Sequence, residues 1–171
     1  MSPGVQQTTV ADQDRYAPHS ICFGCGPANE EGLRIKSHWE GTPGGEGSVF
    51  VMHFDPEARH QAFPGVLNGG ILGTLLDCHS NWCAATAIMH EKGWDRPDCT
   101  VTADFHVRLR RPTPYPGRLT VRAWPESIDD RTCRVRAEVL ADAGGEPKVT
   151  ATCEGTFVAV REGHPAYHRW G

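Results

Sequence analysis

The 171-residue sequence predicts a single α+β domain in which an antiparallel sheet wraps around one long helix. Three observations lead to this fold class. Residues 70–91 have the apolar spacing of a helix, shorter stretches on both sides alternate like strands, and turns rich in glycine and proline separate those stretches. The length suits one domain with a sizeable core, and 39% hydrophobic with 22% charged residues excludes fibrous and wholly disordered classes.

Two strands are expected before the helix, and they form a hairpin. Residues 32–39 and 47–54 have strand patterns, and a glycine-rich turn joins them. A loop over residues 55–67 then leads to the helix. Residues 1–18 are polar and without pattern, so we expect a flexible N-terminal segment followed by one domain over residues 19–162.

The helix is the most informative element, because its residues separate into two faces. An apolar face, predicted to point into the core, contains Ile71, Leu72, Leu75, Leu76, Cys78, His79, Trp82 and Cys83. The other face contains Gly70, Gly73, Thr74, Asp77, Ser80, Asn81 and Ala84. A solvated face usually carries Lys and Glu, whereas this one has small residues and one carboxylate. We therefore expect a close neighbour on the Asp77 side of the helix.

Four strands are expected after the helix. Residues 100–110 alternate strictly, which predicts that one strand face, with Val101, Ala103, Phe105, Val107 and Leu109, is buried. Three further strand patterns cover residues 118–124, 131–140 and 149–160, and residues 163–171 are expected to form a short irregular tail. Two strands, a helix and four strands suit an antiparallel sheet around one apolar helix.

Composition narrows the class of function. A net charge of −4 argues against nucleic-acid binding by charge, although residues 100–140 carry eight basic and five acidic side chains. Those basic side chains suit either a phosphorylated small molecule or a solvated strand face. The N-terminus lacks the features of a signal or transit peptide, and no apolar run could span a membrane. An odd number of cysteines, seven, favours a reduced protein of the cytoplasm.

The start of the helix has the groups that acyl-transfer hydrolysis needs. Glycines at 69 and 70 leave backbone N–H groups at the positive end of the helix dipole, where they can receive a carbonyl oxygen. Asp77 follows two turns later on the same face, so a carboxylate that attacks or activates water could share one pocket with those donors. The alternative from spacing alone is a glycine-rich helix start and a surface aspartate.

The run Gly65-Val-Leu-Asn-Gly-Gly-Ile-Leu-Gly-Thr-Leu-Leu-Asp77 resembles the helix motif of hotdog-fold acyl-CoA thioesterases, in the branch of the phenylacetate-pathway and 4-hydroxybenzoyl-CoA enzymes. The resemblance extends over residues 20–160 and includes the strands at 100–112 and 151–160. It implies a hotdog fold that is at least a homodimer, or a dimer of dimers (a homotetramer), with active sites between subunits. A face of small residues on the helix suits the close approach of a partner.

The resemblance also implies site residues. Asp77 is the nucleophile or general base, and the Gly69 N–H polarises the thioester carbonyl. Gln61 orients substrate or water, and Asn68 stands where the family usually has a histidine, so it can cap the helix but cannot carry a proton. Asn81 and Thr102 match positions where a small polar side chain often assists the reaction. In the family the residue at the Thr102 position usually comes from the partner subunit. The expected substrate-binding residues are Gly70, Asn81, Thr102, His60, Phe63, Arg108 and Arg110.

Four arginines and the two cysteines near the N-terminus are further candidate binding residues, and each group also has a purely structural explanation. Arg108 and Arg110, with Arg111 and Arg118, are candidates for the phosphates of coenzyme A or for solvated strand surface. No cofactor is needed, because thioester hydrolysis uses only water. Cys22 and Cys25 form a Cys-Phe-Gly-Cys turn that we interpret as a structural cap with no metal, since zinc would need two more ligands.

The sequence thus predicts a cytoplasmic enzyme that hydrolyses an acyl- or aryl-CoA thioester to the free acid and coenzyme A. A non-catalytic protein that binds or senses acyl-CoA on the same fold is the alternative, favoured by Asn68. A hydratase would need an Asp and His pair on the helix. His79 lies on the apolar face, which is the wrong face for such a pair, and we expect it to be a hydrogen-bonded core histidine.

Overall fold

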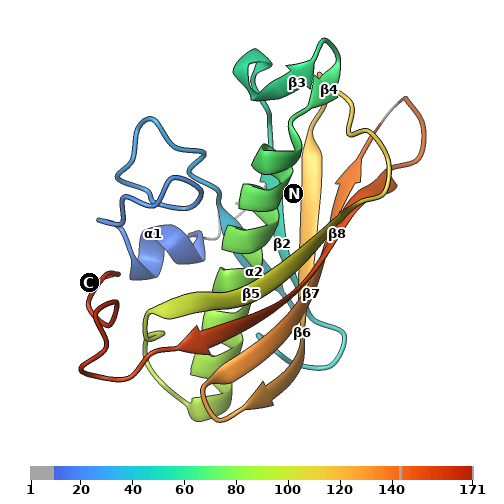
Figure 1. Ribbon diagram of the computed structural model, residues 1–171. Coiled ribbons are helices and arrows are strands. Elements are labelled where there is room, and N and C mark those ends of the chain that lie inside the picture. The colour runs from blue at the N-terminus through green and yellow to red at the C-terminus, as the bar shows by residue number, and fades with distance from the viewer. Residues whose placement is uncertain (1–9, 143, 171) are drawn as a thin grey trace, which may run out of the picture.

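The computed structural model describes residues 10–142 and 144–170, and its main element is a six-stranded antiparallel sheet that curves around helix α2 (Gly69–Lys92; Figure 1). The strands are β1 (Ser37–Glu40), β2 (Val49–Phe54), β5 (Thr100–Leu109), β6 (Leu119–Asp129), β7 (Thr132–Ala141) and β8 (Lys148–Ala159), in the spatial order β1-β2-β6-β7-β8-β5. The predicted fold class is confirmed.

Helix α2 begins and ends where the sequence indicates. The Asn68 side chain caps its N-terminus, and Gly93, with a φ of 66°, ends it in the left-handed conformation that glycine adopts without strain. Apolar residues of the predicted inner face pack against the sheet, and Trp82, Leu75 and Leu76 are among the largest fully buried side chains. Within the described residues, no helix is long and apolar enough to cross a membrane.

The predicted hairpin has a shorter first strand than expected. β1 covers only residues 37–40, because the backbone before it bonds to the loop at residues 20–26 instead of to β2: the N–H groups of Leu33 and Ile35 donate to the carbonyls of Phe23 and Gly24. The loop expected over residues 55–67 contains a turn of 3-10 helix, η1 (Ala58–His60), and a small hairpin of β3 (Gln61–Phe63) and β4 (Val66–Leu67). β6 continues past its expected end through a bulge near Pro125.

Strand β5 lies at the edge of the sheet, and its predicted buried face is wrong for the single chain. Thr100, expected on the outer face, is buried, Val101 is only partly buried, and beyond a bulge near Ala103 Phe105 and Leu109 remain 39% and 58% exposed. Among the described residues only β8 pairs with β5, so one long edge of β5 has no strand beside it. Val107 packs against the core and Leu109 lies next to Gly69 of α2, but within the described residues much of Phe105 and Leu109 stays uncovered.

Residues 10–18 are packed rather than flexible, which corrects the expectation for that part of the N-terminal segment; residues 1–9 lie outside the described residues. Helix α1 (Asp12–Tyr16) inserts Gln13 into the core, where its amide donates to the Ser37 hydroxyl at 3.0 Å. Ser37 lies 2.9 Å from His79 Nδ1, and His79 Nε2–H donates to the Phe50 carbonyl at 2.9 Å.

These bonds fix the proton positions around the buried His79. A carbonyl only accepts, so Nε2 carries the proton, Nδ1 accepts from Ser37, and the ring is neutral. Burial lowers the pKa of His79 to about 3. The histidine is therefore fully hydrogen-bonded within the core, as the sequence predicts.

The C-terminal tail is irregular yet packed. It runs through turns, and Trp170 stacks on Trp82 with ring centroids 4.2 Å apart. The tail therefore returns to the middle of α2, beside the residues described next.

Candidate functional site

A pocket of about 260 Å³ surrounds Asp77 between α2 and the start of β5. Its walls come from the helix, from β5, from the loop before β1 and from the C-terminal tail. The lining residues are Cys22, Cys25, Asp77, Cys78, Asn81, Thr100, Val101, Thr102 and Trp170. Three of the residues that the sequence predicts for the site, Asp77, Asn81 and Thr102, are thus brought together.

Asp77 is half-buried, and one of its oxygens is held by a neighbouring strand. The Thr102 hydroxyl donates to Oδ1 at 2.7 Å. Burial raises the pKa of Asp77 above its ordinary value; the Thr102 hydrogen bond opposes that shift, and a charge on Cys22 would add to it. The expectation that Thr102 comes from a partner subunit is wrong, because β5 lies beside α2 of the same chain and places the hydroxyl there.

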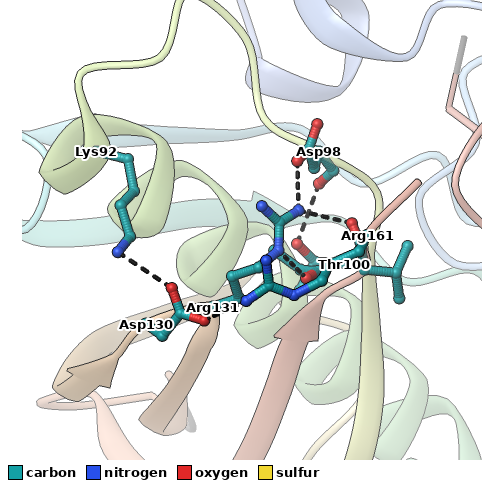
Figure 2. Close-up of polar contacts among 8 residues, drawn as sticks. Lys92, Asp98, Thr100, Asp130, Arg131 and Arg161 are labelled. Atoms are coloured by element: carbon teal, nitrogen blue, oxygen red, sulfur yellow. Dashed lines mark hydrogen bonds and ion pairs between the residues drawn. The ribbon is translucent and has the colours of Figure 1, made fainter.

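The start of β5 is fixed by polar contacts on both sides. Asn81 donates its amide to the Thr100 carbonyl at 3.0 Å, and the Thr100 hydroxyl donates to the Asp98 carbonyl at 3.2 Å. Arg131 donates to the Asp98 carboxylate (Figure 2) and also to the carbonyls of Ala159 and Val160 at 2.7 and 2.6 Å, which ties Asp98 to the end of β8. Thr102 is therefore presented to Asp77 by a firmly held strand end.

The helix start lies outside this pocket. Asn68 Oδ1 accepts the Gly70 N–H at 2.7 Å and the Ile71 N–H at 3.3 Å, so the cap already satisfies Gly70. Among the described residues, the Gly69 N–H has no hydrogen-bond acceptor. Gly69 and Asp77 are eight residues apart on one helix, or roughly 12 Å at 1.5 Å per residue. One chain therefore does not bring both groups to one carbonyl, contrary to the single shared pocket expected from the helical spacing.

The loop ahead of the helix binds its own side chains. Gln61 donates to the Ala58 carbonyl at 2.9 Å and accepts from the Gly65 N–H at 2.7 Å, so its amide shapes the β3–β4 turn. His60 is buried and accepts from the Glu57 N–H at 3.0 Å, and desolvation lowers its pKa. Phe63 is 68% exposed at the tip of this loop. None of these side chains lines the Asp77 pocket.

The predicted phosphate-binding arginines also lie away from Asp77. Arg108 is 3.9 Å from Glu154, and Arg110 donates to the Thr152 hydroxyl at 3.3 Å, both on exposed surface of β5 and β8. Arg118 donates to both oxygens of Asp55, while Arg111 is exposed. A wider hollow of about 810 Å³ lies elsewhere, at the ends of β7 and β8. It does not include Asp77, and its charges are of both signs, so we keep the smaller pocket as the candidate site.

Sequence reasoning missed what covers the Asp77 side of the helix. The loop at residues 20–26 of the same chain packs there: a Cβ on Gly24 would lie 2.9 Å from Thr74 and 2.4 Å from the Cys78 sulfur. This close approach explains the small residues that suggested a partner subunit. Cys22 and Cys25 thereby reach the pocket, and Cys78, expected in the core, lines it. The Cys-x-x-Cys motif is the sequence signal that marks this loop. The sequence does not show that the chain folds back and places the loop on α2.

Solved structures with the same fold include several proteins named as members of the thioesterase superfamily. A thioesterase superfamily protein from Shewanella loihica PV-4 superposes with a TM-score of 0.60 over 79% of this chain and 98% of its own, at 23% identity. The E. coli PaaI protein from the phenylacetic acid degradation operon gives 0.60 over 75% and 81% of the two chains, at 16% identity. Zebrafish thioesterase superfamily member 2 gives 0.58 over 78% and 90%, at 20% identity.

At these identities the superpositions show the shared hotdog fold, and the sequence decides the family. Residues 64–148 match the family described as the thioesterase superfamily. The chain belongs to this superfamily. No curated protein matches it in sequence.

The part matched to the thioesterase superfamily contains most of the candidate site. It covers α2 with Asp77 and Asn81 as well as β5 with Thr102, but it leaves out the loop with Cys22 and Cys25 and the tail with Trp170. Superfamily membership supports thioesterase-like chemistry as a general class. The two segments outside the match complete the pocket in this chain.

Proposed function

We propose that this protein hydrolyses an acyl- or aryl-CoA thioester to the free acid and coenzyme A, with Asp77 as the catalytic carboxylate. The observation that carries the proposal is the position of Asp77: a half-buried carboxylate in a pocket, held at one oxygen by Thr102, while its other oxygen has no partner among the described residues and can contact water or substrate. A carboxylate in this setting suits acyl-transfer chemistry. Membership of the thioesterase superfamily supports the same reaction class.

The reaction needs only water besides the substrate. Asp77 takes a proton from water while the water oxygen bonds to the thioester carbon, and the tetrahedral intermediate then expels the coenzyme A sulfur, which receives a proton. Direct attack by Asp77 would instead form a mixed anhydride that water cleaves. An acid product without ¹⁸O after single-turnover hydrolysis in ¹⁸O-water identifies direct attack with cleavage at the Asp77 carbonyl carbon, because the second acid oxygen then comes from the protein carboxylate.

The oxyanion donor in this proposal comes from a second copy of the chain. Gly69 and Asp77 of one helix are too far apart to act on one carbonyl, whereas the exposed apolar edge of β5 offers a surface for a symmetric homodimer. In such a dimer the Gly69 N–H of one protomer faces the Asp77 of its partner, which gives two equivalent sites. Gln61, Phe63 and the arginines of β5 would then line the site from across the interface.

The test measures free thiol released from short, medium, long and aryl acyl-CoAs. Asp77→Asn keeps the shape of the side chain and removes the base, so we expect turnover to fall about 10²-fold or more. Asp95→Asn, at an exposed aspartate just beyond α2, is the matched control and should retain full activity. Equal turnover of Asp77→Asn and wild type, with unchanged folding, would remove Asp77 from the mechanism.

A protein that binds acyl-CoA without turning it over is the second candidate, and one observation favours it. Asn68 replaces the histidine expected from the family resemblance, and its side-chain oxygen is engaged by two helix N–H groups. It therefore serves as a cap and offers no proton. Acyl-CoA binding by calorimetry without thiol release across the whole panel would select this function.

A further inference from the structure

Three cysteine sulfurs meet beside Asp77. Cys22 and Cys25 come from the loop before β1, and Cys78 comes from α2. Their sulfurs lie within 4.8 Å of one another, and those of Cys22 and Cys78 are 3.8 Å apart. A disulfide would need about 2.05 Å, and all three cysteines are free.

We propose that Cys22, Cys25 and Cys78 bind a zinc ion through three thiolates. Zinc binds cysteine sulfur at about 2.3 Å in tetrahedral geometry, which places neighbouring sulfurs about 3.8 Å apart. The Cys22–Cys78 distance has this value, and the Cys-x-x-Cys spacing is typical of zinc ligands. Each thiol that coordinates releases its proton to solvent.

The loop that supplies two of the ligands has the close backbone packing this site needs. A Cβ at Gly24 would lie 2.4 Å from the Cys78 sulfur, and a Cβ at Gly26 would lie 2.4 Å from the Ser20 carbonyl oxygen. Only glycine fits at either position without a shift. The Gly26 N–H then closes the turn by donating to the Cys22 carbonyl at 2.8 Å. The two glycines thus allow the loop to bring its sulfurs onto the helix.

The proposed zinc ion has one further coordination position, which opens to the pocket. All three cysteines line the same pocket as Asp77 and Asn81, so water or the Asp77 carboxylate can reach that position. The ion would fasten the N-terminal loop to α2 next to the carboxylate. Three thiolates suffice for binding, so this site does not depend on Asp77 or on thioesterase activity.

The test is the metal content of the full chain, purified without chelators and measured by inductively coupled plasma mass spectrometry. We expect about one zinc per chain in the wild type and at least tenfold less in Cys22→Ser and Cys78→Ser. Cys99→Ser, at a buried cysteine outside the cluster, is the matched control and should keep the metal. Cys22 is exposed, so its variant keeps the test valid even if Cys78→Ser does not fold.

A second readout uses cobalt as a probe. After zinc removal under reducing conditions, Co²⁺ should give the visible absorption of a tetrahedral thiolate complex in the wild type, in Cys99→Ser and in Asp77→Asn, but not in Cys22→Ser. A fully reduced wild type that holds no zinc and gives no such absorption overturns the proposal. A disulfide between two of the three cysteines, or a different bound metal at full occupancy, overturns it as well. Neither readout requires turnover, so its result is independent of the proposed thioesterase activity.

Discussion

Asp12→Asn should stabilise the protein at neutral pH. Asp12 is partly buried in the first turn of α1, and its Oδ2 is inaccessible to solvent with no hydrogen-bond partner among the described residues. Desolvation raises its pKa from 3.8 to about 6, with a smaller opposing effect of Arg15. A carboxyl whose pKa is raised by folding favours the folded state at low pH, and it opposes folding as the pH rises from about 4 through 6 and the buried group is forced to ionise.

The magnitude follows from this pKa difference. A shift of about two units corresponds to about 3 kcal/mol of unfolding free energy above pH 7 and to less than 1 kcal/mol at pH 4. The amide loses the favourable interaction of a charge with the helix N-terminus, worth up to about 1 kcal/mol. We therefore expect a net gain of about 2 kcal/mol at pH 7, or a rise in the thermal midpoint of roughly 4 to 8 °C.

The assay is urea and thermal unfolding of wild type and variant from pH 4 to pH 8 at one protein concentration. Asp14→Asn is the matched control, because Asp14 lies on the same helix but is exposed and paired with Lys36. Its loss should change stability by less than about 1 kcal/mol. The reasoning fails if Asp12→Asn is less stable than wild type at pH 7, or if the difference between them does not change with pH.

Two further predictions test the core network and the sheet edge. Ser37→Ala should lower the free energy of unfolding by about 2 to 4 kcal/mol in urea, because it leaves Gln13 and His79 with buried polar groups unpaired. Ser127→Ala, at an exposed serine, should change it little, and equal effects of the two would contradict the network. Phe105→Lys should raise the dissociation constant of the proposed homodimer at least tenfold in analytical ultracentrifugation, since it places a charge on the exposed apolar face of β5. Val10→Lys, at an exposed apolar residue outside β5, should not, and a dimer unaffected by Phe105→Lys would place the interface elsewhere.

The elements that the sequence predicts well are those with local, periodic signals. Helix α2 and most strands follow from hydrophobic spacing, and Asn68 and Gly93 stand at the helix ends with ordinary capping chemistry. Asp77 stands out because a single carboxylate on a face of small residues is unusual. The sequence predicts that Thr102 assists at the site. Residue spacing does not show whether the β5 beside Asp77 belongs to the same chain or to a partner subunit.

The features that sequence reasoning missed depend on contacts between distant segments. Gln13 is polar and lies in a stretch without pattern, yet it is buried with its amide bonded to both the hydroxyl and the N–H of Ser37. Cys78 has the spacing of a core residue, and nothing local indicates that the loop at residues 20–26 returns to it. The alternation of β5 correctly indicates an apolar face. A central strand and an edge strand whose face is covered by a second surface have the same alternation, so the sequence does not distinguish them.

The chain of bonds from Gln13 through Ser37 to His79 also sets an order for folding during synthesis. Gln13 leaves the ribosome long before His79, and a helix of five residues is not stable alone in water. Helix α1 therefore cannot persist until β1 and α2 have been made and have met. The first element to be synthesised is in this way among the last to settle, and a chain shortened to begin at residue 19 would reach the end of synthesis with no amide to complete its core.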